Sequence, residues 1–210
     1  MEKRTLIIIG ALLAVLVGAV VFSKATTPDT PESPGSNNVY GKLDSPVALT
    51  EYVDFQCEAC YAFYPTVKQI KEKYKDRVKF QIKNFPISTS HKYSRLAASY
   101  AESAARQGKF FEMHDKIFEG QKLWETSQEP QTYFDSYGVE IGLDKEKLKQ
   151  DVSSQSVRGT IDADLREVKR LGGSGTPTFA LNGKKIENPE NSVEAFSKLL
   201  DSELAKAGQN

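Results

Sequence analysis

The fold of this chain is decided by residues 49–60, which read LTEYVDFQCEAC. Apolar residues alternate with a period of two through the first half of this stretch, which predicts a strand over residues 47–55. Cys57 and Cys60 follow where a helical pattern begins, and two thiols at this spacing can form a disulfide across one helical turn. Because unpaired N–H groups at a helix N-terminus favour a thiolate, the stretch predicts a redox-active dithiol.

Composition excludes several classes of protein. The 210 residues include 28 basic and 28 acidic side chains, so the net charge is zero and no nucleic-acid partner is expected. Two cysteines are too few for a disulfide scaffold, and the 39% of hydrophobic residues must form the core instead.

The N-terminal segment predicts a membrane anchor. Lys3 and Arg4 lie in a short tail, residues 1–4, before an apolar segment at 5–22 that would span most of a ~30 Å hydrocarbon core at ~1.5 Å per residue. We predict a single-pass transmembrane signal-anchor in the cell membrane, with the N-terminus in the cytoplasm and the catalytic domain extracytoplasmic. The alternative is a cleaved signal peptide and a secreted protein, since residues 23–25 weakly resemble a cleavage site. In either case the domain would work where disulfides persist.

The remaining sequence predicts a flexible linker and one folded domain. Residues 23–38 are almost all small or polar, which is typical of a linker, and the domain is expected at 39–210. Its first strand is followed by a helical pattern at 57–74 and a strand at 78–84, which together predict a right-handed parallel crossover.

The second half of the domain adds helices and a hairpin. The pattern from about 90 to 172 is helical, and it is followed by a strand at 178–181, a hairpin turn at Asn182 and Gly183, and a last helix at 192–206. This order predicts an α/β, thioredoxin-like fold with a helical insertion, preceded by one N-terminal transmembrane helix.

Three segments of the chain resemble the DsbA-like family of extracytoplasmic thiol–disulfide oxidoreductases. They are residues 49–60, residues 107–115 (QGKFFEMHD) and residues 175–183 (GTPTFALNG). The resemblance covers about residues 39–206 and implies disulfide formation in unfolded exported proteins. It also implies reoxidation by a quinone-linked integral membrane partner. No cofactor is expected beyond the disulfide itself.

The resemblance and the spacing together assign roles to the two cysteines. Cys57 would be the exposed nucleophile and Cys60 the buried resolving thiol. The alternatives are an inert disulfide or a metal-binding pair. A metal site is not expected, because the chain has only two histidines and neither lies at zinc-finger spacing.

Two further site residues come from the third segment. Pro177 matches the cis-proline of the family, which faces the cysteine pair, and the backbone of Thr176 would then pair with an extended substrate segment. The alternative is an ordinary trans proline that opens a strand.

Glu51 lies six residues before Cys57, where the family keeps a buried acid. Its apolar neighbours in the predicted strand indicate burial, which should raise its pKa and let it exchange a proton with Cys60. The alternative is a carboxylate that faces solvent near a sheet edge.

Glu58 and Ala59 lie between the cysteines and are expected to tune the redox balance. Family members commonly have proline after the first cysteine, and a negative charge there should disfavour the thiolate and make the dithiol less oxidising. His91, in a loop, could approach the site, whereas His114 is expected to pack on a helix.

Several functions share this sequence pattern. The leading hypothesis is an oxidase of exported proteins. A reductase or an isomerase would use the same residues with a different reduction potential of the cysteine pair. A different class of function is a thioredoxin-like binding module or a carrier of a soft metal. We expect a monomer, because no dimerisation module is visible.

Overall fold

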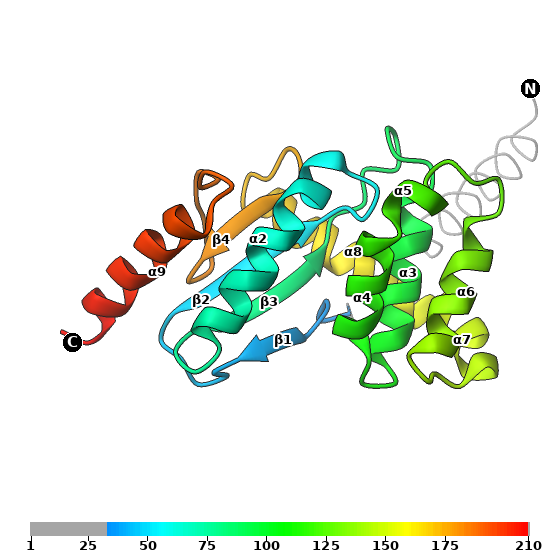
Figure 1. Cartoon of the computed structure of the whole chain (residues 1–210), viewed down its shortest axis with the longest axis horizontal. Helices are drawn as coiled ribbons and strands as arrows, with labels where there is room; N and C mark the ends of the chain where they lie inside the picture. The colour runs from blue at the N-terminus through cyan, green and yellow to red at the C-terminus, as the bar shows by residue number, and fades with distance from the viewer. Residues whose placement is uncertain (1–32, 210) are drawn as a thin grey trace, which may run out of the picture. The chain divides into compact units, whose positions relative to one another are not determined.

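A mixed five-stranded sheet forms the centre of the computed structural model, which describes residues 33–209 (Figure 1). The strand order is β1-β3-β2-β4-β5, and β2 runs parallel to β3 while every other neighbouring pair is antiparallel. The pairing confirms that β2 and β3 are parallel, as predicted. The strands are β1 (Asn38–Gly41), β2 (Ala48–Val53), β3 (Lys79–Asn84), β4 (Thr178–Leu181) and β5 (Lys184–Lys185).

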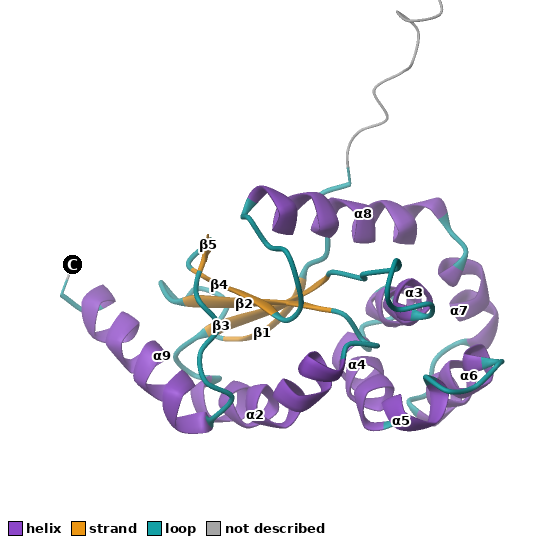
Figure 2. Cartoon of the chain, turned by 90° about the horizontal axis from the view of Figure 1, so that it is seen from above, coloured by secondary structure: helices purple, strands orange, loops and turns teal. Residues whose placement is uncertain are grey.

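Helices cover both faces of the sheet, as Figure 2 shows. Helices α2 (Glu58–Tyr74) and α9 (Val193–Ala207) pack on one face through an apolar cluster that includes Ile70 and Phe196. Helix α8 (Gln155–Arg170) lies on the opposite face, where Val168 packs with Tyr52 and Ala180. The sheet is therefore the middle layer of three, and its central strand β2 is buried on both faces.

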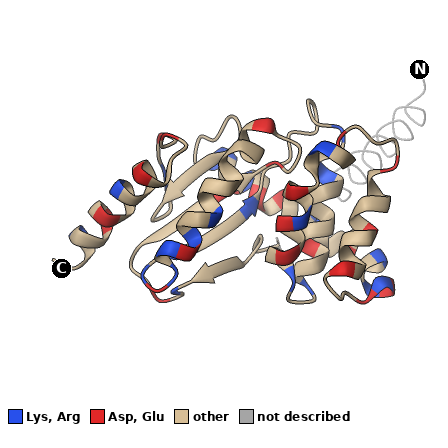
Figure 3. Cartoon of the chain, viewed as in Figure 1, with Lys and Arg blue, Asp and Glu red and all other residues tan. Residues whose placement is uncertain are grey.

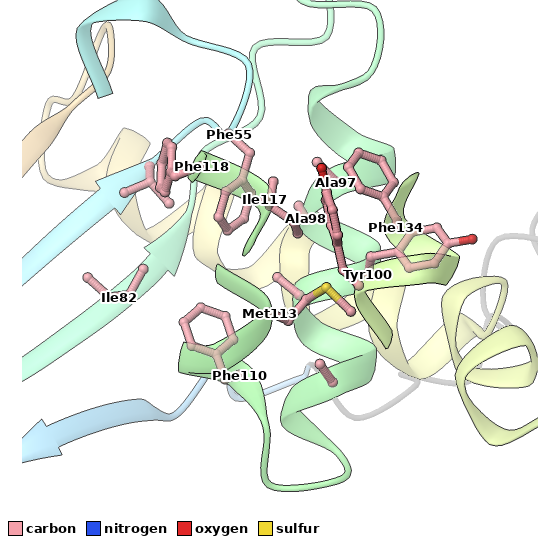
Figure 4. Packing of buried hydrophobic residues seen from close by; sticks show 14 of the residues in the cluster. Phe55, Ile82, Ala97, Ala98, Tyr100, Phe110, Met113, Ile117, Phe118 and Phe134 are labelled. Carbon is pink, nitrogen blue, oxygen red and sulfur yellow. The ribbon is translucent and has the colours of Figure 1, made fainter. Parts of the chain in front are cut away.

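The predicted helical insertion is confirmed between β3 and β4. It consists of α3 (Ser94–Ala105), α4 (Phe110–Glu119), α5 (Gln121–Trp124), α6 (Pro130–Glu140), α7 (Lys145–Val152) and α8. Figure 4 shows how this insertion joins the sheet: Phe55 and Ile82 from the sheet layer pack in one cluster with Phe110, Met113 and Phe118 of α4. This shared core holds α4 and α5 against the end of β2, which is where the cysteines follow.

The predicted hairpin turn is confirmed by backbone geometry. Asn182 and Gly183 have φ values of 51° and 76°, the left-handed conformation that a tight two-residue hairpin requires between β4 and β5. At the start of α7, the Asp144 carboxylate accepts a hydrogen bond from the Lys147 N–H at 2.9 Å and caps the helix.

The predicted boundary between linker and domain at residue 38 is wrong. Ser36 and Asn38 are buried. The Ser36 N–H and hydroxyl donate to the Asp164 carboxylate at 2.9 and 2.6 Å, and Asn38 donates to Glu102 at 2.7 Å. Polar composition conceals this burial, because hydrogen bonds to buried carboxylates offset the cost of removing polar groups from water.

The other predictions for the N-terminal part concern residues 1–4, 5–22 and 23–32, which lie outside the described residues. Among residues 33–209, every helix is too short or too polar to cross a membrane. Figure 3 shows basic and acidic residues interspersed on the helices, in keeping with a net charge of zero.

Candidate active site

The two cysteines lie at the N-terminus of α2. Cys57 is the residue that caps the helix, with extended backbone angles (φ −76°, ψ 125°), and Cys60 lies one turn further on. The Cys57 N–H donates to the Asp54 carbonyl at 3.1 Å, which closes the short loop between β2 and the helix. Both thiols are free; Cys57 is half-buried and Cys60 is buried. Cys60 is therefore buried as the sequence predicts, whereas Cys57 is only partly exposed.

The environments of the two thiols move their pKa values in opposite directions. A hydrogen bond from the Cys60 thiol is the main cause that lowers the pKa of Cys57 to about 5. Partial burial opposes the shift, while Thr176 and the backbone N–H groups of Cys60 and Ala59 support it. Burial raises the pKa of Cys60, with further contributions from Cys57 and Glu51. At neutral pH the dithiol therefore holds a thiolate on the exposed sulfur and a proton on the buried one.

The loop before β4 lies across from the cysteines. The Thr176–Pro177 peptide bond is cis, as the resemblance implies, and the Cys57 sulfur lies 3.4 Å from the Thr176 carbonyl oxygen. Pairing of Tyr52 in β2 with Thr178 in β4 brings this loop beside the nucleophile. An open groove of about 430 Å³ runs along the loop and is lined by residues that include Gly175, Thr176, Pro177, Lys185, Ile186 and Asn188.

Glu51 is buried beneath the site in the central strand. It lies opposite Ile82 of β3 and Phe179 of β4, and only 4% of it is exposed. Desolvation raises its pKa to about 8, and the positive charge of Lys71 acts in the opposite direction. The alternative of a solvent-facing carboxylate near a sheet edge is wrong, because β2 has a neighbour on each side.

Glu58 is exposed to solvent beside a lysine. Its side chain is 85% exposed and lies 3.3 Å from the Lys122 ammonium. A solvated and partly compensated charge acts weakly on its surroundings, so the effect on Cys57 is expected to be small. Ala59 acts instead through its backbone N–H, which points to the Cys57 sulfur.

Sequence reasoning missed two residues that fix the loop carrying the nucleophile. The buried carboxylate of Asp54 accepts hydrogen bonds from the N–H groups of Gln56 (2.8 Å) and Ile87 (2.7 Å). Gln121 of α5 donates to the carbonyl oxygens of Phe55 (2.8 Å) and Cys57 (3.3 Å). An acid three residues before the first cysteine was a usable signal, whereas no local pattern indicates Gln121.

The two histidines have different surroundings. His91 follows β3 in a loop, and its Nδ1 lies 2.7 Å from the Asp54 carboxylate, so it contacts the loop before Cys57. His114 belongs to α4, and its buried ring packs against those of Phe55 and Phe118, as expected. Within residues 33–209, no three His, Cys, Asp or Glu side chains gather closely enough to hold a metal ion.

Comparisons with curated proteins find relatives that are much longer than this chain. The Na(+)/H(+) antiporter NhaA 3 of Salinispora tropica is 31% identical over 177 residues, which are 84% of this chain and 26% of that protein. The Na(+)/H(+) antiporter NhaA 1 of Mycobacterium sp. (strain KMS) is 30% identical over 90% of this chain and 32% of its own length. The chain thus spans between a quarter and a third of these relatives.

Solved structures share the fold over nearly their whole length. BdbD from Bacillus subtilis, in its oxidised form, is 27% identical with a TM-score of 0.67, covering 80% of this chain and 92% of that one. The alpha-DsbA1 of Wolbachia pipientis is 20% identical with a TM-score of 0.71, covering 81% and 92%.

The family follows from a match that covers most of the chain. The sequence model of the family described as thioredoxin matches residues 33–202, which include the cysteine pair, the helical insertion and the cis-proline loop. The chain therefore belongs to the thioredoxin family, and it shares its fold with the solved structures of BdbD and alpha-DsbA1.

Proposed function

We propose that this protein forms disulfides in unfolded exported proteins, with the Cys57–Cys60 disulfide as its oxidant and no other cofactor. The observation that carries the proposal is the asymmetry of the two thiols. A pKa of about 5 at Cys57 means that the reduced form is stabilised as a thiolate at neutral pH. A dithiol stabilised in its reduced form has a disulfide that readily accepts electrons, which favours oxidation of other proteins.

The exchange takes place in two steps. A substrate thiolate attacks the Cys57 sulfur and breaks the Cys57–Cys60 bond, and the Cys60 thiolate that leaves takes a proton from Glu51. A second substrate thiolate then attacks the substrate sulfur of the mixed disulfide, and Cys57 leaves as a thiolate. Two electrons pass from the substrate to the protein, and the protons of the two substrate thiols go to solvent.

Substrate binding would rely on backbone contacts. The Thr176 carbonyl lies at the nucleophile, in the wall of the open groove, where an extended segment can pair with it as an added strand. Main-chain pairing does not depend on side-chain identity, so many unfolded substrates can bind with their cysteine at Cys57. Thr176 and Pro177 are the proposed substrate-binding residues.

The proposed cellular location of the domain depends on the N-terminal segment. An anchor at residues 5–22 would hold the domain on the extracytoplasmic side of the cell membrane, near a quinone-linked integral membrane protein that reoxidises the dithiol. Tethering raises the effective concentration of the two partners without any new contact. A monomer suffices for this cycle, because both cysteines belong to one chain.

The direction of the reaction is tested by mixing the oxidised full chain with a reduced peptide that contains two cysteines. We expect one peptide disulfide per chain in the absence of other oxidants, and no reaction with Cys57→Ser. The Cys60→Ser variant, mixed instead with the oxidised form of the peptide, should accumulate a mixed disulfide between Cys57 and the peptide, which identifies Cys57 as the residue that exchanges.

Equilibration with a graded glutathione couple supplies the second measurement. We expect a potential between about −120 and −180 mV, the range of strong protein oxidants. A potential near −270 mV, typical of thioredoxin, would make the protein a reductase. Retention of biological function by Cys57→Ser would instead indicate a binding module.

A further inference from the structure

A small cavity that contains several ionisable side chains lies between β2, α2 and α4. Its volume is about 10 Å³, which is about the space that one water molecule needs. Helices α2 and α4 lie next to each other in both views of the chain (Figures 1 and 2). The wall consists of Glu51, Tyr64, Val67, Lys68, Lys71, His114, Asp115 and Phe118. A cavity with this many ionisable groups is suited to a bound water.

The inner wall holds a buried acid and a buried base. Glu51 comes from β2 and Lys71 from α2, and both are buried. The Lys71 ammonium lies 4.0 Å from the centre of the Phe111 ring and 4.9 Å from that of Tyr40. Burial lowers the pKa of Lys71, while Asp115 and Glu51 both act to raise it. Lys71 therefore interacts with carboxylates at the inner and the outer end of the cavity.

The outer wall is a histidine–aspartate pair that reaches the surface. His114 is buried, and its Nδ1 lies 3.0 Å from the Asp115 carboxylate. Its Nε2 is buried too and forms no hydrogen bond with any described residue. Asp115 is 27% exposed and lies 2.9 Å from the ammonium of Lys68, which is 45% exposed. The pair therefore connects the cavity with solvent.

We propose that a water molecule in this cavity hydrogen-bonds to Nε2 of His114 and to the Glu51 carboxyl group, and that His114 carries protons between Glu51 and solvent. The proposal rests on the proposed role of Glu51 as the proton donor to Cys60. A neutral imidazole can release a proton from one nitrogen and take one up at the other, which suits it to this task. Asp115 would orient the ring, and it would lie at the end of the proton path that opens to solvent.

The cycle balances in protons. When the disulfide is reduced, Glu51 protonates Cys60, and the carboxylate regains a proton from Nε2–H through the water while Nδ1 takes a replacement from the Asp115 side. When the dithiol is reoxidised, Cys60 returns its proton to Glu51 and the same route runs outward. One proton enters and one leaves, so the original tautomer of His114 is restored and no electron passes through the ring.

The charged groups around the cavity are compatible with a neutral histidine. The titratable groups on or near its wall are Glu51 from β2, Cys60, Tyr64, Lys68 and Lys71 from α2, and Asp115 from α4. Burial lowers the pKa of His114, and the nearby lysines add to this effect while Asp115 opposes it. The imidazole is therefore neutral at pH 7, with one nitrogen able to accept a proton.

A purely structural role for His114 makes a different prediction. The ring lies within 6 Å of the ring centres of Phe55, Tyr64, Phe110 and Phe118, a setting in which any aromatic side chain could pack. The variant His114→Phe keeps a ring in this setting and removes both nitrogens. It therefore separates packing from proton transfer.

The test is stopped-flow reduction of the oxidised full chain by dithiothreitol between pH 5 and 9, in H₂O and in D₂O. We expect His114→Phe to slow the reduction about 10-fold, since positioned proton transfer contributes ~10²-fold or more and bulk water replaces only part of it. The solvent isotope effect should rise, and imidazole in the buffer should speed up His114→Ala but not the unmodified protein. The ultraviolet titration of the Cys57 thiolate should not change.

Glu102→Gln is the matched control. Glu102 is another buried acid, and burial raises its pKa to about 7, but it hydrogen-bonds to Asn38 and Asn84 rather than lining this cavity. The Glu102→Gln variant should be reduced by dithiothreitol at the same rate as the unmodified protein, with the same isotope effect. If His114→Phe does not fold, as thermal melting would show, the partly exposed Asp115→Asn takes its place with the same expected direction.

The proposal is overturned if the folded variant matches the unmodified protein in rate and isotope effect at every pH. Dithiothreitol reduces the disulfide whatever the biological direction of the enzyme. A protein that fails to oxidise the cysteine peptide therefore refutes the oxidase proposal without touching the relay. Conversely, normal peptide oxidation with an unaffected His114→Phe refutes the relay alone.

Discussion

The sulfur of Cys57 lies 3.4 Å from the carbonyl oxygen of Thr176, although 119 positions separate the two residues in the chain. Antiparallel pairing of β2 with β4 makes this contact, because Tyr52 lies opposite Thr178 and each strand leads directly into one of the two loops. The attacked sulfur and the backbone group proposed to bind an extended substrate therefore share one surface. A substrate cysteine bound through Thr176 would be placed at the nucleophile.

The low pKa of Cys57 is open to direct titration. Ultraviolet absorbance of the thiolate in the reduced chain should show a midpoint at about pH 5, and this transition should disappear in Cys57→Ser. Because the hydrogen bond from Cys60 is the largest cause of the shift, Cys60→Ala should move the midpoint upward. A midpoint near 9 in the unmodified protein would contradict the proposed oxidase.

The same shift makes the stability of the reduced protein depend on pH. The folded pKa lies below the unfolded value of 9.0, so the stabilisation is fully present above pH 9 and is lost as the pH falls through 5. Urea unfolding of the reduced chain against Cys57→Ala should show this loss between pH 9 and 5. A pH-independent difference between the two would argue against a stabilised thiolate.

Glu51→Gln should change stability with the opposite sign. The folded pKa of about 8 lies above the unfolded 4.5, so stability is complete below pH 4.5 and falls as the pH rises through 8. The variant should remove this decline and be more stable than the unmodified protein by a few kcal/mol above pH 8, since one pKa unit corresponds to ~1.4 kcal/mol. Oxidised chains should be compared, so that Cys57 does not titrate.

Kinetics give Glu51→Gln an independent readout. Reduction of its disulfide should slow about 10- to 100-fold near neutral pH, because Cys60 would leave without a proton donor. Glu102→Gln serves as the control here too and should keep the normal rate. A normal rate in Glu51→Gln would assign the buried acid to structure alone.

Asp54→Ala should destabilise the loop before the nucleophile. The change leaves the N–H groups of Gln56 and Ile87 without their acceptor, and each unsatisfied buried group costs ~1–3 kcal/mol. We expect a loss of about 2 to 4 kcal/mol in the free energy of unfolding, measured in urea. His91→Ala, which leaves both of these bonds in place, should cost about 1 kcal/mol or less. Equal losses in the two variants would refute this account of Asp54.

Glu58→Pro tests whether the residue after the first cysteine tunes the redox balance. Removal of the negative charge should raise the potential measured against glutathione, and the exposure of Glu58 and its pairing with Lys122 limit the rise to about 30 mV, or ~1.4 kcal/mol. Glu58→Gln removes the charge without changing the backbone, so it separates charge from proline geometry. An unchanged or lower potential in both variants would exclude the charge effect.

Local patterns were sufficient for most of the fold. The period-two run before Cys57, the helical pattern after it and the Asn182–Gly183 turn predicted β2, α2 and the hairpin, because each depends on neighbours in sequence. The edge strand β1 was missed because it is short and polar, and its burial depends on distant carboxylates such as Glu102. The domain therefore begins earlier than its composition indicates.

What the sequence by itself determined is the dithiol at a helix N-terminus and the buried acid beneath it, because spacing and apolar neighbours are local properties. Only the tertiary structure decided which distant groups complete the site. Strand pairing brings Thr176 to Cys57, packing of α4 against α2 places His114 and Asp115 beside the cavity of Glu51, and Gln121 of α5 reaches the loop of the nucleophile. These contacts arise from long-range pairing and a shared apolar core, which no window of neighbouring residues encodes.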